Sequence, residues 1–235
     1  MWSGPRNIST AMMRSWGNRD DSVVCDEPFY AHYLHSTAKD HPGAQEIIAA
    51  GETDWKKVVA ALTGEIPGGK RIFFQKHMTH HLLPHISRDW LGMVTNCFLI
   101  RDPREMLTSY VKIVSNPSIE DTGFPQQTEI FDWVRNHLKI TPPVLDSVDV
   151  LNHPRRMLGL LCDALGVEFQ EAMLEWPAGP RETDGVWARH WYGEVEKSTG
   201  FRPYKPKLEP ISLQLQPLYE QCAEHYARLY AHRLK

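Results

Sequence analysis

The sequence has few cysteines and no long apolar run, and its charges are nearly balanced. The four cysteines are scattered along 235 residues without a CxxC pair, which predicts reduced thiols in a cytoplasmic protein. No apolar run approaches the ~20 residues that span a bilayer. The sequence also lacks a basic segment followed by an apolar stretch, so we expect no secretory signal. We therefore expect no membrane partner. The net charge of -3 argues against a nucleic-acid partner.

The remaining composition is typical of a folded globular protein. Hydrophobic residues make up 42% and charged residues 23% of the chain, which excludes a disordered chain, a collagen and a coiled coil. A length of 235 residues fits one core of ordinary size. We therefore expect a single domain over residues 1–235.

Short apolar runs alternate with helical stretches along the chain. The runs at 71–77 and 95–100 are continuous, as in parallel strands that are covered on both faces. Shorter strands are expected at 22–25 and 143–145. Helices are expected at 11–16, 28–35, 44–50, 54–64, 102–114, 126–139, 154–165 and 211–232, with a long loop over 176–209. This alternation predicts an α/β fold with a parallel sheet.

The loop 3–10 is the first segment with the character of a binding site. It is rich in glycine, proline, serine and threonine, and Ser9 or Thr10 is expected to cap the helix that follows. Backbone N–H groups in such a loop and the positive end of the helix attract anions. If a Walker A motif is counted from Gly4, its lysine falls at position 10, which is Thr10. Arg6 is the only cationic residue in the loop 3–10. The loop therefore suits an anion other than a magnesium-bound triphosphate, or it is an ordinary turn.

A second candidate site follows the strand at 95–100. Arg101 lies at the rim where open α/β sheets bind ligands. Asp102 and Pro103 begin the next helix, which carries Ser109 eight residues after Arg101. Helical side chains lean toward the N-terminus, so Arg101 and Ser109 can converge on a phosphate. Alternatively, Arg101 pairs with Asp102 or another carboxylate.

Together the two segments resemble the sulfotransferases that use 3′-phosphoadenosine 5′-phosphosulfate (PAPS). That family has a P-[KR]-x-G-[ST]-[ST] loop for the 5′-phosphosulfate and a later R-x7-S pairing for the 3′-phosphate. The resemblance assigns the 5′-phosphosulfate to Arg6, Asn7, Ser9 and Thr10, and the 3′-phosphate to Arg101 and Ser109. The segment 152–167, which ends in Leu-Gly-Val, is similar to a late family segment, so the likeness covers most of the chain.

The opening WSGPRNISTAMM is similar to a subgroup of sulfotransferase-like proteins, some of which carry an aminotransferase-like name. No pyridoxal-phosphate lysine motif supports that chemistry here. The resemblance implies a P-loop-type three-layer sandwich whose parallel sheet has about five strands in the order 2-3-1-4-5. It also implies transfer of a sulfuryl group from PAPS, without a metal, to a hydroxyl or amine of a small-molecule or glycan acceptor.

The sequence departs from the family pattern at two places. Ile8 stands where the family usually has a glycine, so the loop must differ locally. Only Met1 and Trp2 precede the loop, where the family has several apolar residues. We therefore expect a first strand that is short or truncated.

The family offers two candidates for the base that takes the acceptor's proton. Glu27 follows the second strand in a Glu-Pro context similar to that of several carbohydrate and lipid-glycan sulfotransferases. His77 ends the third strand, where cytosolic sulfotransferases have a K-x-H motif. In that motif the histidine is the base and the lysine binds the sulfate. The register is imperfect here, because a motif that begins at Lys76 would have Met78 in the place of the histidine. We rank Glu27 above His77. The alternatives are a charge at a helix terminus for Glu27 and a core residue for His77.

The segment 195–201 is similar to the basic, glycine-containing loop that covers the nucleotide in sulfotransferases. The likeness suggests that Lys197, Ser198 and Thr199 bind the nucleotide, and that Trp187 or Trp191 stacks on adenine. A solvated turn is the alternative.

Three other functions stay open. A zinc enzyme is suggested by the histidine cluster His77, His80, His81 and His85. A P-loop kinase-like phosphotransferase needs a loop lysine and a magnesium-binding carboxylate, and the loop lacks the lysine. A degenerate, non-catalytic nucleotide- or protein-binding module of the same fold would fit Ile8 and the short first strand.

Overall fold

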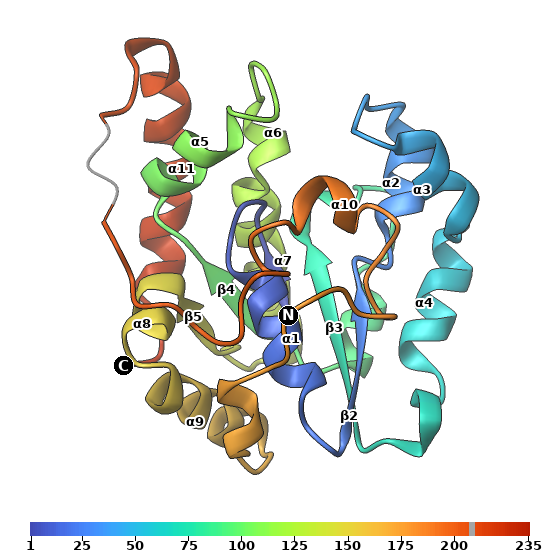
Figure 1. The fold of residues 1–235 in the computed structure, drawn as a ribbon. Coiled ribbons are helices and arrows are strands. Elements are labelled where there is room, and N and C mark those ends of the chain that lie inside the picture. Colours follow the sequence, from blue (N-terminus) through green and yellow to red (C-terminus); the bar gives the residue numbers. More distant parts are fainter. Residues whose placement is uncertain (207–209) are drawn as a thin grey trace.

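A parallel sheet forms the centre of the computed structural model, which describes residues 1–206 and 210–235. Within these ranges, five strands pair in the order β2-β3-β1-β4-β5, and every pairing is parallel (Figure 1). The strands are β1 (Trp2–Ser3), β2 (Ser22–Asp26), β3 (Ile72–Met78), β4 (Phe98–Ile100) and β5 (Val144–Asp146). The α/β fold, the parallel pairing, the strand order and the short first strand are thereby confirmed.

Each predicted helical segment contains a helix. The helices are α1 (Ser9–Gly17), α2 (Tyr30–Thr37), α3 (Ala44–Ala50), α4 (Trp55–Thr63), α5 (Pro103–Tyr110), α6 (Ile119–Thr122), α7 (Phe124–Leu138), α8 (Ser147–Asn152), α9 (Pro154–Leu165), α10 (Ala188–Trp191) and α11 (Gln216–Tyr230). The helix predicted to reach residue 114 ends at Tyr110, and α6, α8 and α10 were not predicted. Short 3₁₀ helices lie at Pro67–Gly69, Thr79–His81, Asp89–Met93, Glu171–Leu174 and Leu213–Leu215. Gly166 ends α9 with a left-handed φ of 68°, as predicted.

Other predicted boundaries were wrong or lie outside the described residues. Neither Ser9 nor Thr10 caps α1: both are inside its first turn, and the N-cap position is Ile8, which makes no side-chain cap bond. Pro28 precedes α2 instead of starting it. The predicted loop 176–209 contains α10, and its residues 207–209 lie outside the described residues.

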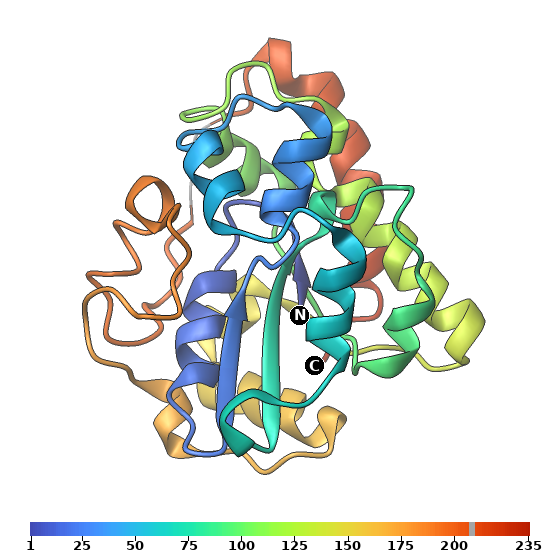
Figure 2. The same ribbon diagram turned by 90° about the vertical axis from the view of Figure 1, so that its right-hand side faces the viewer.

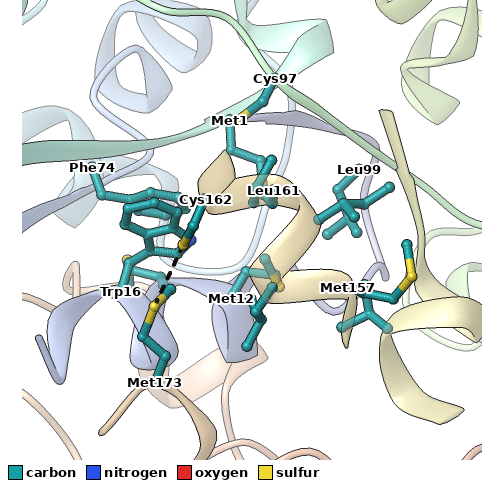
Figure 3. Packing of buried hydrophobic residues seen from close by; sticks show 14 of the residues in the cluster. Met1, Met12, Trp16, Phe74, Cys97, Leu99, Met157, Leu161, Cys162 and Met173 are labelled. Carbon is teal, nitrogen blue, oxygen red and sulfur yellow. Dashed lines mark hydrogen bonds between the residues drawn. The ribbon is translucent and has the colours of Figure 1, made fainter. Parts of the chain in front are cut away.

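Helices cover both faces of the sheet, because alternate residues of each buried strand point in opposite directions. Leu99 packs with α1, α8 and α9 on one face, whereas Phe98 packs with α4, α7 and α11 on the other. Figure 2 shows α1 on one side of the strands and α4 and α7 on the other. Figure 3 shows the first of these layers, in which Trp16 from α1 meets Phe74 and Cys162. Among the described residues, no helix has the length and apolar character needed to cross a membrane.

The two-residue strand β1 is held by its neighbours on both sides. The Trp2 N–H donates to the Cys97 carbonyl at 2.8 Å, and the His77 N–H donates to the Met1 carbonyl at 2.9 Å. The indole of Trp2 donates to Asn96 Oδ1 at 2.9 Å and stacks on the His77 ring with centroids 4.4 Å apart. These contacts bury Trp2 at the middle of the sheet, so the loop after β1 leaves the sheet at its carboxyl-terminal rim.

Residues 176–206, here called the late segment, are tied to the layer of α1 by a buried ion pair. Arg14 donates to both Asp184 oxygens, at 2.5 and 2.6 Å, and the two side chains are only 2% and 4% exposed. Asp184 also accepts the Arg181 N–H at 2.8 Å. Because this ion pair has little contact with water, removal of either side chain would leave the other charge buried without compensation.

We predict that Asp184→Asn lowers the free energy of unfolding by about 3–5 kcal/mol, because it leaves the Arg14 charge buried without a counter-charge. Denaturant unfolding followed by circular dichroism measures the change. Glu171→Gln is the matched control, since Glu171 pairs with Arg155 at the surface with 65% of its side chain exposed; it should cost less than ~1 kcal/mol. Equal effects of the two substitutions would contradict the prediction.

Candidate functional site

The loop between β1 and α1 is shaped by its own side chains. Asn7 Oδ1 accepts the Ile8 N–H at 2.8 Å, while Asn7 Nδ2 donates to the Leu99 carbonyl at 3.0 Å and ties the loop to β4. A Cβ at Gly4 would lie 2.9 Å from the Thr122 carbonyl oxygen, so only glycine fits there. Ile8 has an ordinary φ of -88°, and its side chain packs on the α1 core layer. The position therefore needs no glycine, which explains one departure from the family pattern.

Arg6, Arg101 and Ser109 meet at this loop, as the spacing predicted. Arg6 Nε donates to Ser109 Oγ at 3.0 Å, and an Arg101 Nη donates to the Arg6 carbonyl at 2.6 Å. Arg101 also pairs with Glu105 at 3.1 Å. Asp102 caps α5 instead, by accepting the Arg104 N–H at 2.7 Å. The proximity is confirmed, while the phosphate-binding role of these residues stays a prediction.

Two guanidinium groups, those of Arg6 and Arg101, lie together at this end of the rim, with Glu105 paired to Arg101. Burial, and then the nearby charge of Arg101, lowers the pKa of Arg6 from its ordinary value. The first turn of α1 adds N–H groups that have no partner inside a helix, and among the described residues its N-cap side chain does not cover them. An anion bound here would relieve the repulsion between the two guanidinium groups.

A buried cluster of charged and phenolic groups lies at the ends of β2 and β3. Lys76 Nζ donates to Asp26 at 2.8 Å, to Glu27 at 2.5 Å and to the Tyr192 hydroxyl at 2.7 Å. The Tyr192 hydroxyl in turn donates to Asp26 Oδ2 at 2.7 Å. The side chain of Lys76 is 2% exposed. Three segments that are distant in sequence therefore converge on one ammonium group.

Burial sets the acid–base properties of this cluster. It raises the pKa of Glu27 above the ordinary value of 4.5, against the opposing effect of the Lys76 charge. Burial also disfavours the charge of Lys76, but Asp26 and Glu27 outweigh it and hold the pKa of Lys76 well above its usual range. The ammonium is therefore stably charged, whereas Glu27 is poised to exchange a proton at higher pH than an exposed carboxylate.

Backbone strain coincides with two of the candidate site residues, Arg6 and Glu27. Arg6 has a φ of 53° and Glu27 a φ of 41°, in the left-handed region that non-glycine residues seldom occupy. Such conformations cost on the order of 1–3 kcal/mol and persist where the surrounding contacts enforce them. Tertiary contacts therefore hold the backbone of both residues in a conformation that they would not adopt by local preference.

One cleft of about 300 Å³ joins the two groups at the carboxyl-terminal rim of the sheet. The loop 5–11 forms one wall, and the late segment, through Tyr192, Ser198 and Arg202, forms part of another. Figure 1 shows α2 and α10 beside the upper end of β3, around this rim. Arg6, Asn7, Ser9, Thr10, Arg101, Glu27, Lys76, His80 and His81 all line the cleft.

His77, the second candidate base, does not line this cleft. Lys76 and Met78 line the cleft, whereas the intervening His77 points to the opposite face of β3, as alternation along a strand requires. There its ring stacks on Trp2 and lies 5.9 Å from Phe29. His77 is therefore a core residue in this structure, which was the alternative interpretation.

The late segment meets the cleft differently from the prediction. Lys197 pairs with Glu194 at the surface with 70% of its side chain exposed. Ser198 lines the cleft, but its hydroxyl donates to the Val195 carbonyl at 2.6 Å and accepts from the Trp176 indole at 3.1 Å. Of Lys197, Ser198 and Thr199, only Ser198 is among the lining residues, and of the two tryptophans only Trp191 is.

Two cleft residues, Tyr192 and Arg202, were not singled out from the sequence. Three others entered in different roles: Lys76 as the sulfate-binding lysine of K-x-H, and His80 and His81 as zinc ligands. Alternation along β3 was the signal available for Lys76, since Phe74, Lys76 and Met78 share a face. Tyr192 and Arg202 gave no such signal, because only the path of the late segment brings them to the cleft.

The four clustered histidines do not form a common metal site. His80 and His81 lie in the cleft, His77 lies in the core, and His85 Nε2 is 2.9 Å from His32 Nε2. Within residues 1–206 and 210–235, no group of three or more histidine, cysteine, aspartate or glutamate residues is arranged to hold a metal ion.

Comparison with known proteins gives relatives of two kinds. Two curated proteins of Arabidopsis thaliana, branched-chain-amino-acid aminotransferase-like proteins 2 and 1, are 35% and 34% identical to the chain. Each match covers 98% of this chain but 41% of the relative, so the chain spans less than half of either protein. The solved sulfotransferase domain of the Synechococcus PCC 7002 olefin synthase superposes with a TM-score of 0.58 at 17% identity, covering 100% of this chain and 94% of that one.

That structural likeness shows the fold alone, because the identity is low. A family model described as a sulfotransferase domain matches residues 1–219, which is nearly the whole chain. The chain therefore belongs to the sulfotransferase-domain family.

Proposed function

We propose that the chain transfers a sulfuryl group from PAPS to a hydroxyl or amine of an acceptor. The observation that carries this proposal is the separation of charge along one cleft. Arg6 and Arg101 stand at one end, after β1 and β4, and Glu27 stands at the other, after β2. A polyanionic donor and a proton-accepting carboxylate are what sulfuryl transfer requires at neighbouring positions.

The donor would lie along the basic end of the cleft. Arg101 and Ser109 would hold the 3′-phosphate by charge-assisted hydrogen bonds. Arg6, Asn7, Ser9 and Thr10, with the first N–H groups of α1, would hold the 5′-phosphosulfate. Ser198 and Trp191 reach the cleft from the late segment and would contact the nucleotide; Lys197 and Thr199 would act only after a movement of that segment.

In the proposed reaction the acceptor oxygen or nitrogen forms a bond to sulfur, and the bond between sulfur and the bridging oxygen of the 5′-phosphate breaks. The acceptor's proton passes to Glu27 and then to solvent. The electron pair of the broken bond stays on the leaving 5′-phosphate, whose charge Arg6 and the loop N–H groups stabilise. Lys76 would keep Glu27 oriented through their 2.5 Å hydrogen bond.

We further propose that residues 1–235 act as a single domain, in the cytoplasm, on a small-molecule or glycan acceptor, without nucleic-acid or membrane partners. The scattered cysteines and the balanced charge support this setting.

The nucleotide end is tested by Arg101→Ala. Loss of its charge-assisted hydrogen bonds, worth about 1.5–3 kcal/mol, should weaken binding of 3′,5′-ADP by roughly 10–150-fold in calorimetry. Arg155→Ala is the matched control, because Arg155 is 64% exposed in a surface ion pair. Unchanged affinity in the Arg101 variant would place the nucleotide elsewhere.

The base is tested by Glu27→Gln. Turnover with PAPS should fall by roughly 10²–10⁴-fold, while 3′,5′-ADP affinity stays near that of the unchanged protein. Because only the ionised carboxylate accepts a proton and burial raises the pKa of Glu27, wild-type turnover should rise with pH through a pKa above 4.5. The variant should lack this rise. Glu224→Gln, on the exposed surface of α11, is the control; full activity of Glu27→Gln would remove the carboxylate from the mechanism.

Metal dependence separates sulfuryl transfer from the kinase alternative. The loop has Thr10 in place of a Walker lysine, and Asp102 caps α5, so we predict full sulfuryl transfer in EDTA. The assay measures sulfated product with and without added magnesium. Strict dependence on magnesium would favour a phosphotransferase, and 3′,5′-ADP binding without any transfer would favour a non-catalytic module.

A further inference from the structure

His81 is clamped between two tyrosine rings at the acidic end of the cleft. Its ring centroid lies 4.5 Å from that of Tyr30 and 4.7 Å from that of Tyr33, with interplanar angles of 13° and 28°. Its side chain is 3% exposed, and its Nδ1 lies 3.9 Å from Glu27 Oε2. This separation is too long for a direct hydrogen bond. An oxygen atom placed between them can, however, lie within about 2.8 Å of both.

Two buried ring nitrogens of histidines that line the cleft have no hydrogen-bond partner among the described residues. They are Nδ1 of His81 and Nδ1 of the neighbouring His80. A buried polar atom without a partner costs roughly 1–3 kcal/mol, so a ligand that supplies one is favoured. Burial lowers the pKa of His80 to about 3 and that of His81 well below its usual range. Both rings are therefore neutral at physiological pH.

Among the described residues, the charged side chains nearest His81 and His80 are already paired with one another. Lys76 already donates to two carboxylates and to Tyr192. Lys39, which faces His80, is paired with Asp121 at 2.6 Å. The guanidinium groups of Arg6 and Arg101 stand after β1 and β4, at the other end of the cleft. That of Arg202 comes from the late segment, where it donates to the Lys197 carbonyl at 3.3 Å. An anionic acceptor would meet Glu27 without a compensating cation, and a cationic one would lose its hydration among aromatic rings.

We infer that this end of the cleft is the acceptor subsite and that it takes an uncharged compound with a hydroxyl group and a ring, either a phenol or a sugar. The inference rests on the proposed sulfuryl transfer. The acceptor hydroxyl lies between Glu27 Oε2 and His81 Nδ1: it gives its proton to Glu27 as its oxygen bonds to sulfur, and the clamped His81 ring holds the hydroxyl by a hydrogen bond. Tyr30 and Met78, which also line the cleft, provide apolar surface for the ring of the acceptor.

A charge series on one phenol tests the subsite. The probes are 4-ethylphenol, tyramine and 3-(4-hydroxyphenyl)propionate, which share the phenol and differ in the charge of a side chain of similar length, with methyl β-glucoside as the sugar arm. Calorimetry in the presence of 3′,5′-ADP should show a neutral probe bound at least about tenfold more tightly than either charged phenol. If 4-ethylphenol binds more tightly than the glucoside, the acceptor is a phenol, and if the glucoside binds more tightly, the acceptor is a sugar. Equal or tighter binding of a charged phenol, or no binding of any probe, overturns the inference.

His81→Phe tests the role of the imidazole, because it keeps a ring between Tyr30 and Tyr33 and removes both nitrogens. It should weaken the neutral probe by about tenfold and leave 3′,5′-ADP affinity within about twofold; unchanged probe affinity overturns the role of His81. If a neutral probe binds but is not sulfated from PAPS, the proposed function fails and the subsite stands. If all three phenols are sulfated equally well, the proposed function stands and the subsite fails.

Discussion

A lysine ammonium that is shut off from water must be surrounded by hydrogen-bond acceptors, and this requirement organises the cleft. Lys76 satisfies it with Asp26 and Glu27 at the end of β2 and with Tyr192 from the late segment. Removal of any one acceptor would leave a buried charge less than fully compensated. The lysine therefore determines how β2 ends beside β3 and where the late segment crosses the rim.

The strand order then separates positive from negative groups. Because β1 lies between β3 and β4, the loop with Arg6 stands between the acidic cluster and Arg101. An anionic donor bound to the loop would have guanidinium groups on one side and Glu27 on the other. The reacting sulfur would thus face the base without a conformational rearrangement of the sheet.

The histidine of β3 and those of the 3₁₀ helix after it have different environments and therefore different uses. His77 is stacked on Trp2 inside the core, while His81 follows the strand in a 3₁₀ turn and faces Glu27. Burial keeps both rings neutral by lowering their pKa values. Of these two, His81 lies in the cleft and His77 does not, so His81 is the one placed to contact an acceptor.

The sequence alone determined the elements of the sheet and one end of the site. Continuous apolar runs predicted β3 and β4, because strands covered on both faces have no polar side, and the spacing of Arg101 and Ser109 across a strand–helix junction predicted their meeting with the loop. The sequence did not identify His81 as the cleft imidazole, since His81 lies in the 3₁₀ helix that follows β3, where alternation along a strand no longer sets the direction of a side chain. Nor did it reveal Tyr192, which lies 116 residues from Lys76. Only the tertiary structure decided these points, because burial and long-range packing, which local sequence preferences do not encode, select which polar groups share a cleft.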